Sequence, residues 1–222
     1  MAKKHPEGYL SAKESRRISR ENRKITDQYE KQYRRKNVPE QEYLTQMHNP
    51  ENAVEFDNLH TYFFTDVGTV KSVDGVSFEV PVGKTVGVVG ESGCGKTTCG
   101  RTCLGMYNKT DGQVLYRGKD VHRMSRSEKY AFKKNAQIVF QDPYSSLDPS
   151  HTVQDIICEP MAIHKMYTPK ERKERAKELI RVVGLKEQDL LKYPHEFSGG
   201  QRQRISIARA LSVQPEFVVC DE

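Results

Sequence analysis

The chain has 222 residues, of which 36% are hydrophobic and 30% charged, enough for one large domain or two small ones. The formal net charge is +6, and the first 50 residues carry 12 Lys or Arg against 7 Asp or Glu. The rest of the chain is near neutral, which argues against a domain that binds nucleic acid over its whole surface. No apolar run approaches the roughly 20 residues needed to span a bilayer. The five cysteines lack metal-site spacing and do not form a disulfide framework, so we expect a reducing cytosol.

Residues 1–50 are predicted to form a basic, partly helical N-terminal extension. Residues 11–36 contain no Pro or Gly and are rich in Lys, Arg, Glu and Gln. A thin apolar stripe at helical spacing is formed by Ile18, Ile25, Tyr29 and Tyr33. Two interpretations remain open: a solvated basic helix, or a helix that contacts an acidic membrane surface or a partner.

From about residue 53 onward, predicted strands and helices alternate. Residues rich in β-branched and aromatic side chains predict strands at 54–64, 72–80, 113–116, 136–140 and 216–220. The apolar run 85–89 is typical of a strand buried on both faces, and we expect the last strand to be buried too. Helices are expected at 96–106, 168–183 and 201–212, the second starting with a capping box of Thr168 and Glu171. This alternation predicts an α/β fold with a largely parallel sheet.

The segment GESGCGKT, residues 90–97, fits the pattern G-x-x-x-x-G-K-[ST] in full. It follows a predicted strand and begins a predicted helix, so backbone N–H groups and the helix N-terminus would point at phosphate oxygens. Lys96 would reach the β- and γ-phosphates of ATP, and the Thr97 hydroxyl would bind Mg²⁺. The predicted nucleotide-binding residues here are Gly90, Glu91, Ser92, Gly93, Cys94, Gly95, Lys96, Thr97 and Thr98.

The last apolar run of the chain ends in two carboxylates, Asp221 and Glu222. Nucleotide hydrolases with a phosphate loop use such a second strand to hold Mg²⁺. We expect Asp221 to bind the metal through water. Glu222 is the predicted general base, which would orient and polarise the attacking water.

Two further segments carry a family resemblance. The sequence YPHEFSGGQRQR, residues 193–204, resembles the signature of ABC-transporter ATPases, and Gln141 in VFQDPYSSLDP matches the Q-loop of that family. The wording GESGCGKTT, FQDPYSSLDP and YPHEFSGGQRQRISIARAL is similar to the oligopeptide/dipeptide importer subfamily, and most of all to its second type of ATPase subunit. The resemblance covers residues 53–222 and leaves residues 1–50 aside.

The resemblance implies a P-loop NTPase fold with an antiparallel β subdomain and a helical subdomain at about 142–200. It makes Gln141 a catalytic residue that contacts Mg²⁺ or the attacking water. It also implies that an aromatic residue stacks on adenine, with Phe63 as the first candidate and Tyr62 as the alternative, although a plain core aromatic fits as well. A second nucleotide contact, reaching the ATP held by a partner subunit, is implied for Ser198, Gly199, Gly200 and Gln201.

The function implied is that of the ATPase subunit of an ABC importer for oligopeptides or dipeptides. Such a subunit pairs with a second ATPase subunit in a nucleotide-sandwich dimer and is held by two membrane permeases at the cytoplasmic face of the membrane. An extracytoplasmic substrate-binding protein supplies the cargo, and no specific nucleic acid is expected. Because the family continues with a D-loop and a switch histidine, we expect a C-terminally truncated chain. The alternatives are a soluble ABC-type ATPase acting on ribosomes or nucleic acid, and a nucleotide-binding fragment without turnover.

Overall fold

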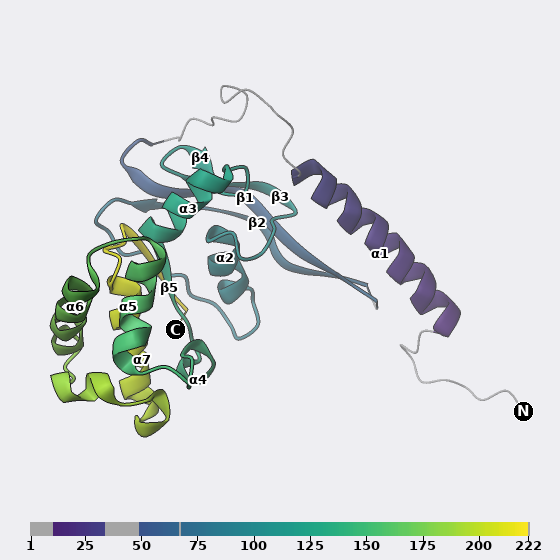
Figure 1. Ribbon diagram of the computed structural model, residues 1–222. Helices are drawn as coiled ribbons and strands as arrows, with labels where there is room; N and C mark the ends of the chain where they lie inside the picture. The colour runs from purple at the N-terminus through teal and green to yellow at the C-terminus, as the bar shows by residue number, and fades with distance from the viewer. Residues whose placement is uncertain (1–10, 34–48, 67, 222) are drawn as a thin grey trace, which may run out of the picture. The chain divides into compact units, whose positions relative to one another are not determined.

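The computed structural model describes residues 11–33, 49–66 and 68–221, without the side chains of 29–33. The chain divides into two compact units, Met1–Met124 and Ser125–Glu222, and each is considered by itself. Figure 1 labels their helices and strands. The N-terminal helix α1, Ala12–Tyr33, confirms the helix predicted within residues 11–36, of which 34–36 lie outside the described residues.

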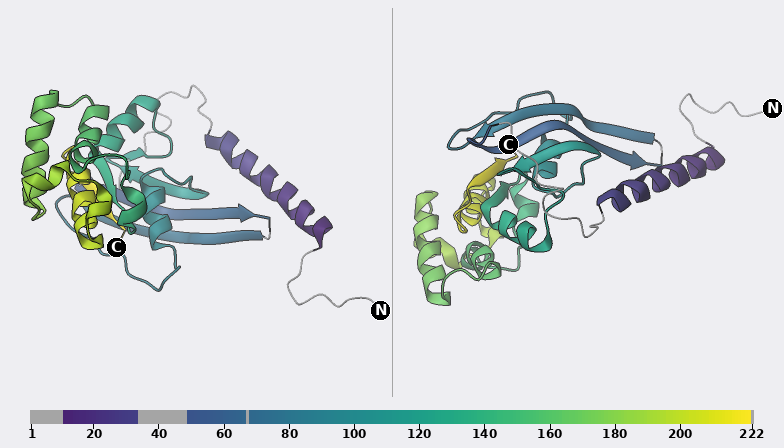
Figure 2. Two further views of the ribbon diagram at one scale, coloured as in Figure 1. Left: turned by 60° about the horizontal axis from the view of Figure 1, so that its bottom comes forward. Right: turned by 90° about the horizontal axis from the view of Figure 1, so that it is seen from above.

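The first unit is built on an antiparallel sheet with the strand order β2-β1-β3-β4. Its strands are β1 (Asn52–Thr65), β2 (Gly68–Pro81), β3 (Asp111–Tyr116) and the short β4 (Lys119–Asp120). Figure 2 shows β1 and β2 as a long hairpin. These strands confirm the predictions at 54–64, 72–80 and 113–116.

Helix α2, Lys96–Cys103, is fastened to this sheet by hydroxyl groups. The Oγ1 atoms of Thr61 and Thr102 lie 3.1 Å apart, and Ser72 Oγ lies 2.9 Å from Thr98 Oγ1. The helix confirms the prediction at 96–106 but ends at Cys103. Since α2 begins within the GESGCGKT segment, residues 90–97, these contacts fix the C-terminal end of that segment against β1 and β2.

The strand predicted at 85–89 is wrong. No strand forms at 84–91, and Val86, Val88 and Val89 are 40%, 50% and 92% exposed. A strand buried on both faces needs neighbouring strands and covering helices, and neither sheet of the described residues takes up this run. Apolar composition alone therefore did not decide the conformation of this segment.

The second unit combines helices with one parallel strand pair, β5 (Ala136–Val139) and β6 (Phe217–Cys220). A largely parallel sheet was predicted, but within the described residues parallel pairing is confined to these two strands, and the four-stranded sheet of the first unit is antiparallel. The predicted burial of the last strand is wrong, because β6 is only partly buried and Cys220 is exposed. The helices are α3 (Arg126–Asn135), α4 (Pro143–Ser146), α5 (Val153–Ile163), α6 (Pro169–Val182), α7 (Gly199–Leu211), and the 3₁₀ turns η2 (Glu187–Leu191) and η3 (Pro194–Glu196).

Helices α5, α6 and α7 enclose the main apolar core of the second unit. Helix α6 starts as predicted, with Thr168 Oγ1 accepting from the Glu171 N–H and Glu171 accepting from the Thr168 N–H. The core contains Leu147, Val153, Ile156, Ile157, Ala176, Leu179, Ile180, Leu190, Phe197, Ile205 and Ala208. Helix α7 confirms the helix predicted at 201–212. Across the described residues, no helix combines the length and apolarity that a membrane span requires.

Candidate nucleotide-binding site

The phosphate loop runs from the exposed Gly90 to the first turn of α2. It is closed by a turn in which the Cys94 N–H donates to the Glu91 carbonyl at 3.3 Å. The Cys99 N–H then donates to the Gly95 carbonyl at 2.8 Å, which starts the regular hydrogen bonding of the helix. The loop is therefore an exposed turn held at a helix N-terminus, where partial positive charge favours an anion.

Gly95 is the residue on which this arrangement depends. It is the N-cap of α2, with φ 97°, and no side chain among the described residues caps the helix. A Cβ atom at Gly95 would lie 2.1 Å from the Ser72 carbonyl oxygen of β2. Both the left-handed backbone and this close approach require glycine here. The second glycine of the motif thus lets the loop pack directly on the backbone of the sheet.

The Lys96 side chain contacts two carbonyl groups of the loop. Its ammonium Nζ donates to the Gly90 carbonyl and to the Glu91 carbonyl, each at 2.8 Å. The Cys94 Sγ lies 3.9 Å from the same nitrogen. The side chain consequently holds a positive charge beside the first two residues of the loop.

The thiols near the loop differ in their surroundings. Cys94 is exposed, whereas Cys99 and Cys103 are buried on α2. Burial raises the pKa of Cys99 to about 11, and burial together with the neighbouring Cys99 raises the pKa of Cys103 further. Both helix thiols are therefore protonated at neutral pH and act as packing residues.

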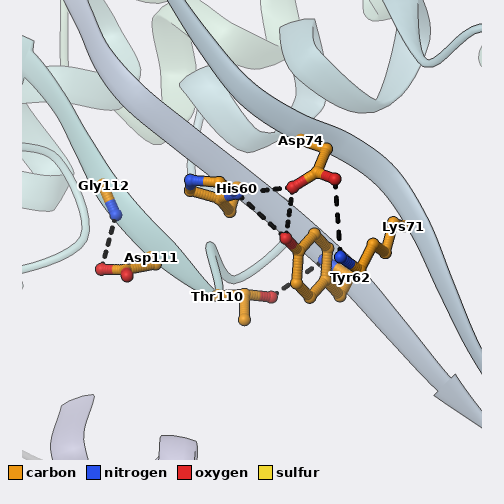
Figure 3. A network of polar contacts seen from close by, with 7 residues as sticks. All are labelled: His60, Tyr62, Lys71, Asp74, Thr110, Asp111 and Gly112. Carbon is orange, nitrogen blue, oxygen red and sulfur yellow. Dashed lines mark hydrogen bonds and ion pairs between the residues drawn. The ribbon is translucent and has the colours of Figure 1, made fainter.

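The two candidate adenine-stacking residues make different contacts on β1. Figure 3 shows the Tyr62 hydroxyl and the His60 ring both directed at the Asp74 carboxylate, with Lys71 on its other oxygen. Hydrogen bonds from Tyr62 and His60 hold the pKa of Asp74 below its usual value. Tyr62 is thus engaged in a polar network.

Phe63 is 36% exposed and packs edge-on against Tyr107, with the two ring centroids 5.3 Å apart. Phe63 therefore has the freer aromatic surface of the two.

In the second unit, Gln141 and Asp221 follow the ends of paired parallel strands. Val139 of β5 lies opposite Cys220 of β6, and the Asp221 N–H donates to the Val139 carbonyl at 2.9 Å. Asp221 is buried and Gln141 is exposed. The structure therefore brings these two predicted residues to one edge of the strand pair. The third residue predicted for this chemistry, Glu222, lies outside the described residues.

The signature residues form the capped N-terminus of α7. Ser198 Oγ accepts from the Gln201 N–H at 3.4 Å, and Gln201 Oε1 accepts from the Ser198 N–H at 2.9 Å. Phe197, immediately before, is 5% exposed and belongs to the helical core. A Cβ at Gly199 would lie 3.8 Å from the Tyr144 ring, and at Gly200 it would meet open space. Phe197 therefore anchors the start of α7 in the core, and the two glycines that follow Ser198 leave the backbone of the first turn uncovered by their own side chains.

Sequence reasoning did not find the contact that joins this turn to the segment after Gln141. The Arg202 guanidinium lies over the Tyr144 ring, 3.9 Å from its centroid, and Arg202 Nε donates to the Phe197 carbonyl at 3.0 Å. The Asp142 carboxylate accepts from the Tyr144 N–H and caps α4. Only the Asp-Pro pair at 142–143, a helix-start signal, could have pointed to this ordered turn.

The predicted magnesium ligands are all oxygen donors: the Thr97 hydroxyl, the Gln141 amide and the Asp221 carboxylate. Hard oxygen ligands suit Mg²⁺, whereas most Zn²⁺ sites include Cys sulfur or His nitrogen. Within the described residues, no group of three or more His, Cys, Asp or Glu side chains could hold a metal ion. The donor chemistry thus fits the predicted ion.

A loop that ends in a glycine at a helix N-terminus, with the following lysine bonded to the loop carbonyls, is the defining feature of a P-loop nucleotide-binding protein. Residues 73–222 match the family model described as ABC transporter, and the chain belongs to that family.

The comparisons agree with this assignment. The chain is 53% identical over 174 residues to the oligopeptide transport ATP-binding protein OppF of Bacillus subtilis, covering 78% of this chain and 57% of the relative. It is 47% identical over 180 residues to the dipeptide transport ATP-binding protein DppF of Lactococcus lactis, covering 79% and 58%. It thus spans little more than half the length of these curated relatives.

Solved structures support the predicted fold class. The ATP-binding cassette MJ0796, in a dimeric post-hydrolysis state bound to ADP and Pi, aligns with a TM-score of 0.70 at 25% identity, covering 76% of this chain and 73% of that one. The protein cbiO1 of Clostridium perfringens, part of the cbiONQ transporter complex, aligns with a TM-score of 0.65 at 26% identity, covering 78% and 66%. The fold class is therefore that of ABC ATPase cassettes.

Proposed function

We propose that this chain is the ATP-binding and ATP-hydrolysing part of an ABC importer for oligopeptides or dipeptides. The observation that carries the proposal is the phosphate loop, with Lys96 Nζ 2.8 Å from two loop carbonyls and Gly95 packed on β2. The cargo class rests on the likeness to the oligopeptide and dipeptide transport ATP-binding proteins.

In this proposal each unit contributes a separate task. The loop residues 90–98 bind the triphosphate, with Lys96 balancing its negative charge and Thr97 offering a hydroxyl to Mg²⁺. Phe63 stacks on the adenine ring. Asp221 and Gln141 serve as metal and water contacts, and Glu222 accepts a proton from the attacking water. Bound Mg²⁺ would supply charge neutralisation at the β- and γ-phosphates.

The proposed assembly is a nucleotide-sandwich dimer with a second ATPase subunit. Ser198, Gly199, Gly200 and Gln201 would contact the ATP held by that partner, through the N-terminus of α7. Two membrane permeases would hold the dimer at the cytoplasmic face of the membrane, and an extracytoplasmic substrate-binding protein would deliver the peptide. The dimeric structure of MJ0796 and the membership of cbiO1 in a transporter complex support this arrangement.

Nucleotide binding and nucleotide hydrolysis are tested separately on the wild-type protein. We expect calorimetric titration to detect ATP binding that is stronger with Mg²⁺ than with EDTA, and phosphate release to accompany it. The variant Glu222→Gln should keep ATP binding and lose phosphate release, because an amide cannot accept the proton. Wild-type turnover in this variant would remove Glu222 from its proposed role.

The same measurements test the alternative that the chain is a nucleotide-binding fragment without turnover. Binding of ATP by the wild-type chain without any phosphate release would favour a nucleotide-binding fragment over a working ATPase. Absence of ATP binding, in a protein whose circular dichroism shows it to be folded, would contradict the proposed function altogether.

A further inference from the structure

Helix α1 carries a basic surface that the nucleotide site does not use. Between its start and Lys24 the helix carries six exposed cations, which we call the basic face of α1: Lys13, Arg16, Arg17, Arg20, Arg23 and Lys24. At 100° per residue these positions fall within about one third of the helix circumference. The face ends at Lys24, one turn before Asp27. The ion pairs within the described residues all lie outside this helix, so its charges face solvent.

The opposite side of α1 is turned toward the sheet of the first unit. Asn22 is 9% exposed, and its side-chain amide donates to the Thr65 carbonyl at the end of β1. Ile18 and Ile25, one turn away on either side, are half-buried. Because Ile18 and Ile25 lie on this side, the part of α1 whose side chains are described leaves no apolar face to insert into a bilayer. Any partner of the basic face is therefore bound through charge at a surface.

The distribution of charge favours a membrane over nucleic acid. The first 50 residues hold a net +5 of the chain's +6, so the rest of the protein would add almost nothing to a nucleic-acid contact. Binding to a flat anionic surface, by contrast, needs only one basic face. Each Lys or Arg near the inner leaflet raises the binding constant about fivefold. Further basic residues flank α1 in the sequence: Lys3, Lys4, Arg34, Arg35 and Lys36.

We propose that the basic face of α1 binds anionic phospholipid headgroups of the membrane on which the importer works. The choice of membrane rests on the proposed function, whereas the basic face itself does not. The contact would hold the ATPase subunit near the bilayer in addition to its contacts with permeases. Its strength should depend steeply on salt, because exposed charges are screened within about 10 Å at 0.1 M salt.

The test is flotation of the wild-type protein, without nucleotide, on vesicles of phosphatidylcholine with or without 30% phosphatidylserine. We expect binding only to the anionic vesicles, and loss of that binding at 0.5 M salt. The triple variant Arg16→Gln, Arg20→Gln, Lys24→Gln should bind at least about tenfold more weakly. A control variant with the same loss of charge, Arg126→Gln, Lys129→Gln, Lys173→Gln, changes exposed residues of α3 and α6 and should bind like wild type.

Each result decides the matter. Equal binding by the two triple variants would show a general charge effect and overturn the proposal, as would equal binding to neutral vesicles. Binding of a fluorescent RNA duplex that is lost in the α1 variant, with no vesicle binding, would assign the face to nucleic acid instead. Circular dichroism verifies that each variant is folded. ATP titration of the same proteins separates this outcome from the proposed function, because α1 contributes no residue to the phosphate loop.

Discussion

The N-termini of α2 and α7 are both proposed to bind phosphate, yet they are built differently. Gly95 is the N-cap of α2, which has no side-chain cap from any described residue, and the Lys96 side chain contacts the Gly90 carbonyl of the loop before the helix. The N-cap of α7 is Ser198, which forms a reciprocal capping box with Gln201. The first design leaves the place of a capping oxygen to a ligand. The second is capped by its own side chains, so its first turn is ordered without a ligand.

The largest effect is expected from Gly95→Ala, which would break the design at α2. A Cβ atom would meet the Ser72 carbonyl oxygen at 2.1 Å, and the backbone has φ 97°. We expect a loss of about 3 kcal/mol or more in the free energy of unfolding, measured by urea denaturation, and no measurable ATP binding.

The matched control is Gly83→Ala, at a residue with φ 70° and no heavy atom within 4 Å of the added Cβ. It separates backbone strain, which costs about 1–2 kcal/mol, from the clash with β2. If both variants lose the same free energy of unfolding, the close approach of Gly95 to Ser72 contributes nothing to the cost of the Gly95 substitution.

Lys96→Ala should have the next largest effect, on ligand binding and not on folding. The exposed loop keeps its turn, but the charge over Gly90 and Glu91 is lost. A charged hydrogen bond contributes about 1.5–3 kcal/mol, so ATP affinity measured by calorimetry should fall about 10- to 150-fold. Lys84→Ala removes a charge from another exposed residue of the first unit and should leave the affinity unchanged. Unaltered binding by the Lys96 variant would remove this side chain from the phosphate site.

Local signals in the sequence sufficed where neighbours in the chain decide the structure. The capping box of Thr168 and Glu171 predicted the start of α6, and segments rich in β-branched and aromatic residues predicted β1 and β2. The segment 85–89 was misjudged, because a buried strand is defined by the strands beside it and not by its own residues.

The same limit applies within the site. The motif predicted the position of the phosphate loop and of Lys96, since glycine spacing and a following helix are local features. The approach of Gly95 to Ser72 and the stacking of Arg202 on Tyr144 join residues far apart in the chain. Such contacts depend on how elements pack, which no local pattern contains.

The design at α7 is tested by Ser198→Ala, compared with Thr168→Ala at the start of α6. Both hydroxyls accept from an N–H group three residues later, at 3.4 Å and 3.3 Å. Each variant should lose about 1 kcal/mol in the free energy of unfolding. Only Ser198→Ala should also weaken ATP-dependent dimerisation, measured by analytical ultracentrifugation. Equal dimerisation of the two variants would contradict a nucleotide contact at Ser198.

The smallest effect concerns the stacking of Arg202 on Tyr144, which orders the first turn of α7 from outside the helix. Tyr144 is 61% exposed, so the contact lies at the surface and should contribute about 0.5–1 kcal/mol. A double-mutant cycle of Arg202→Lys and Tyr144→Leu measures it, because lysine keeps the charge but lacks the planar group that stacks on the ring. We expect a coupling energy of that size in urea unfolding. A coupling near zero would mean that α7 is ordered by Phe197 and the capping box alone, and the difference between the two helix N-termini would then lie entirely in their caps.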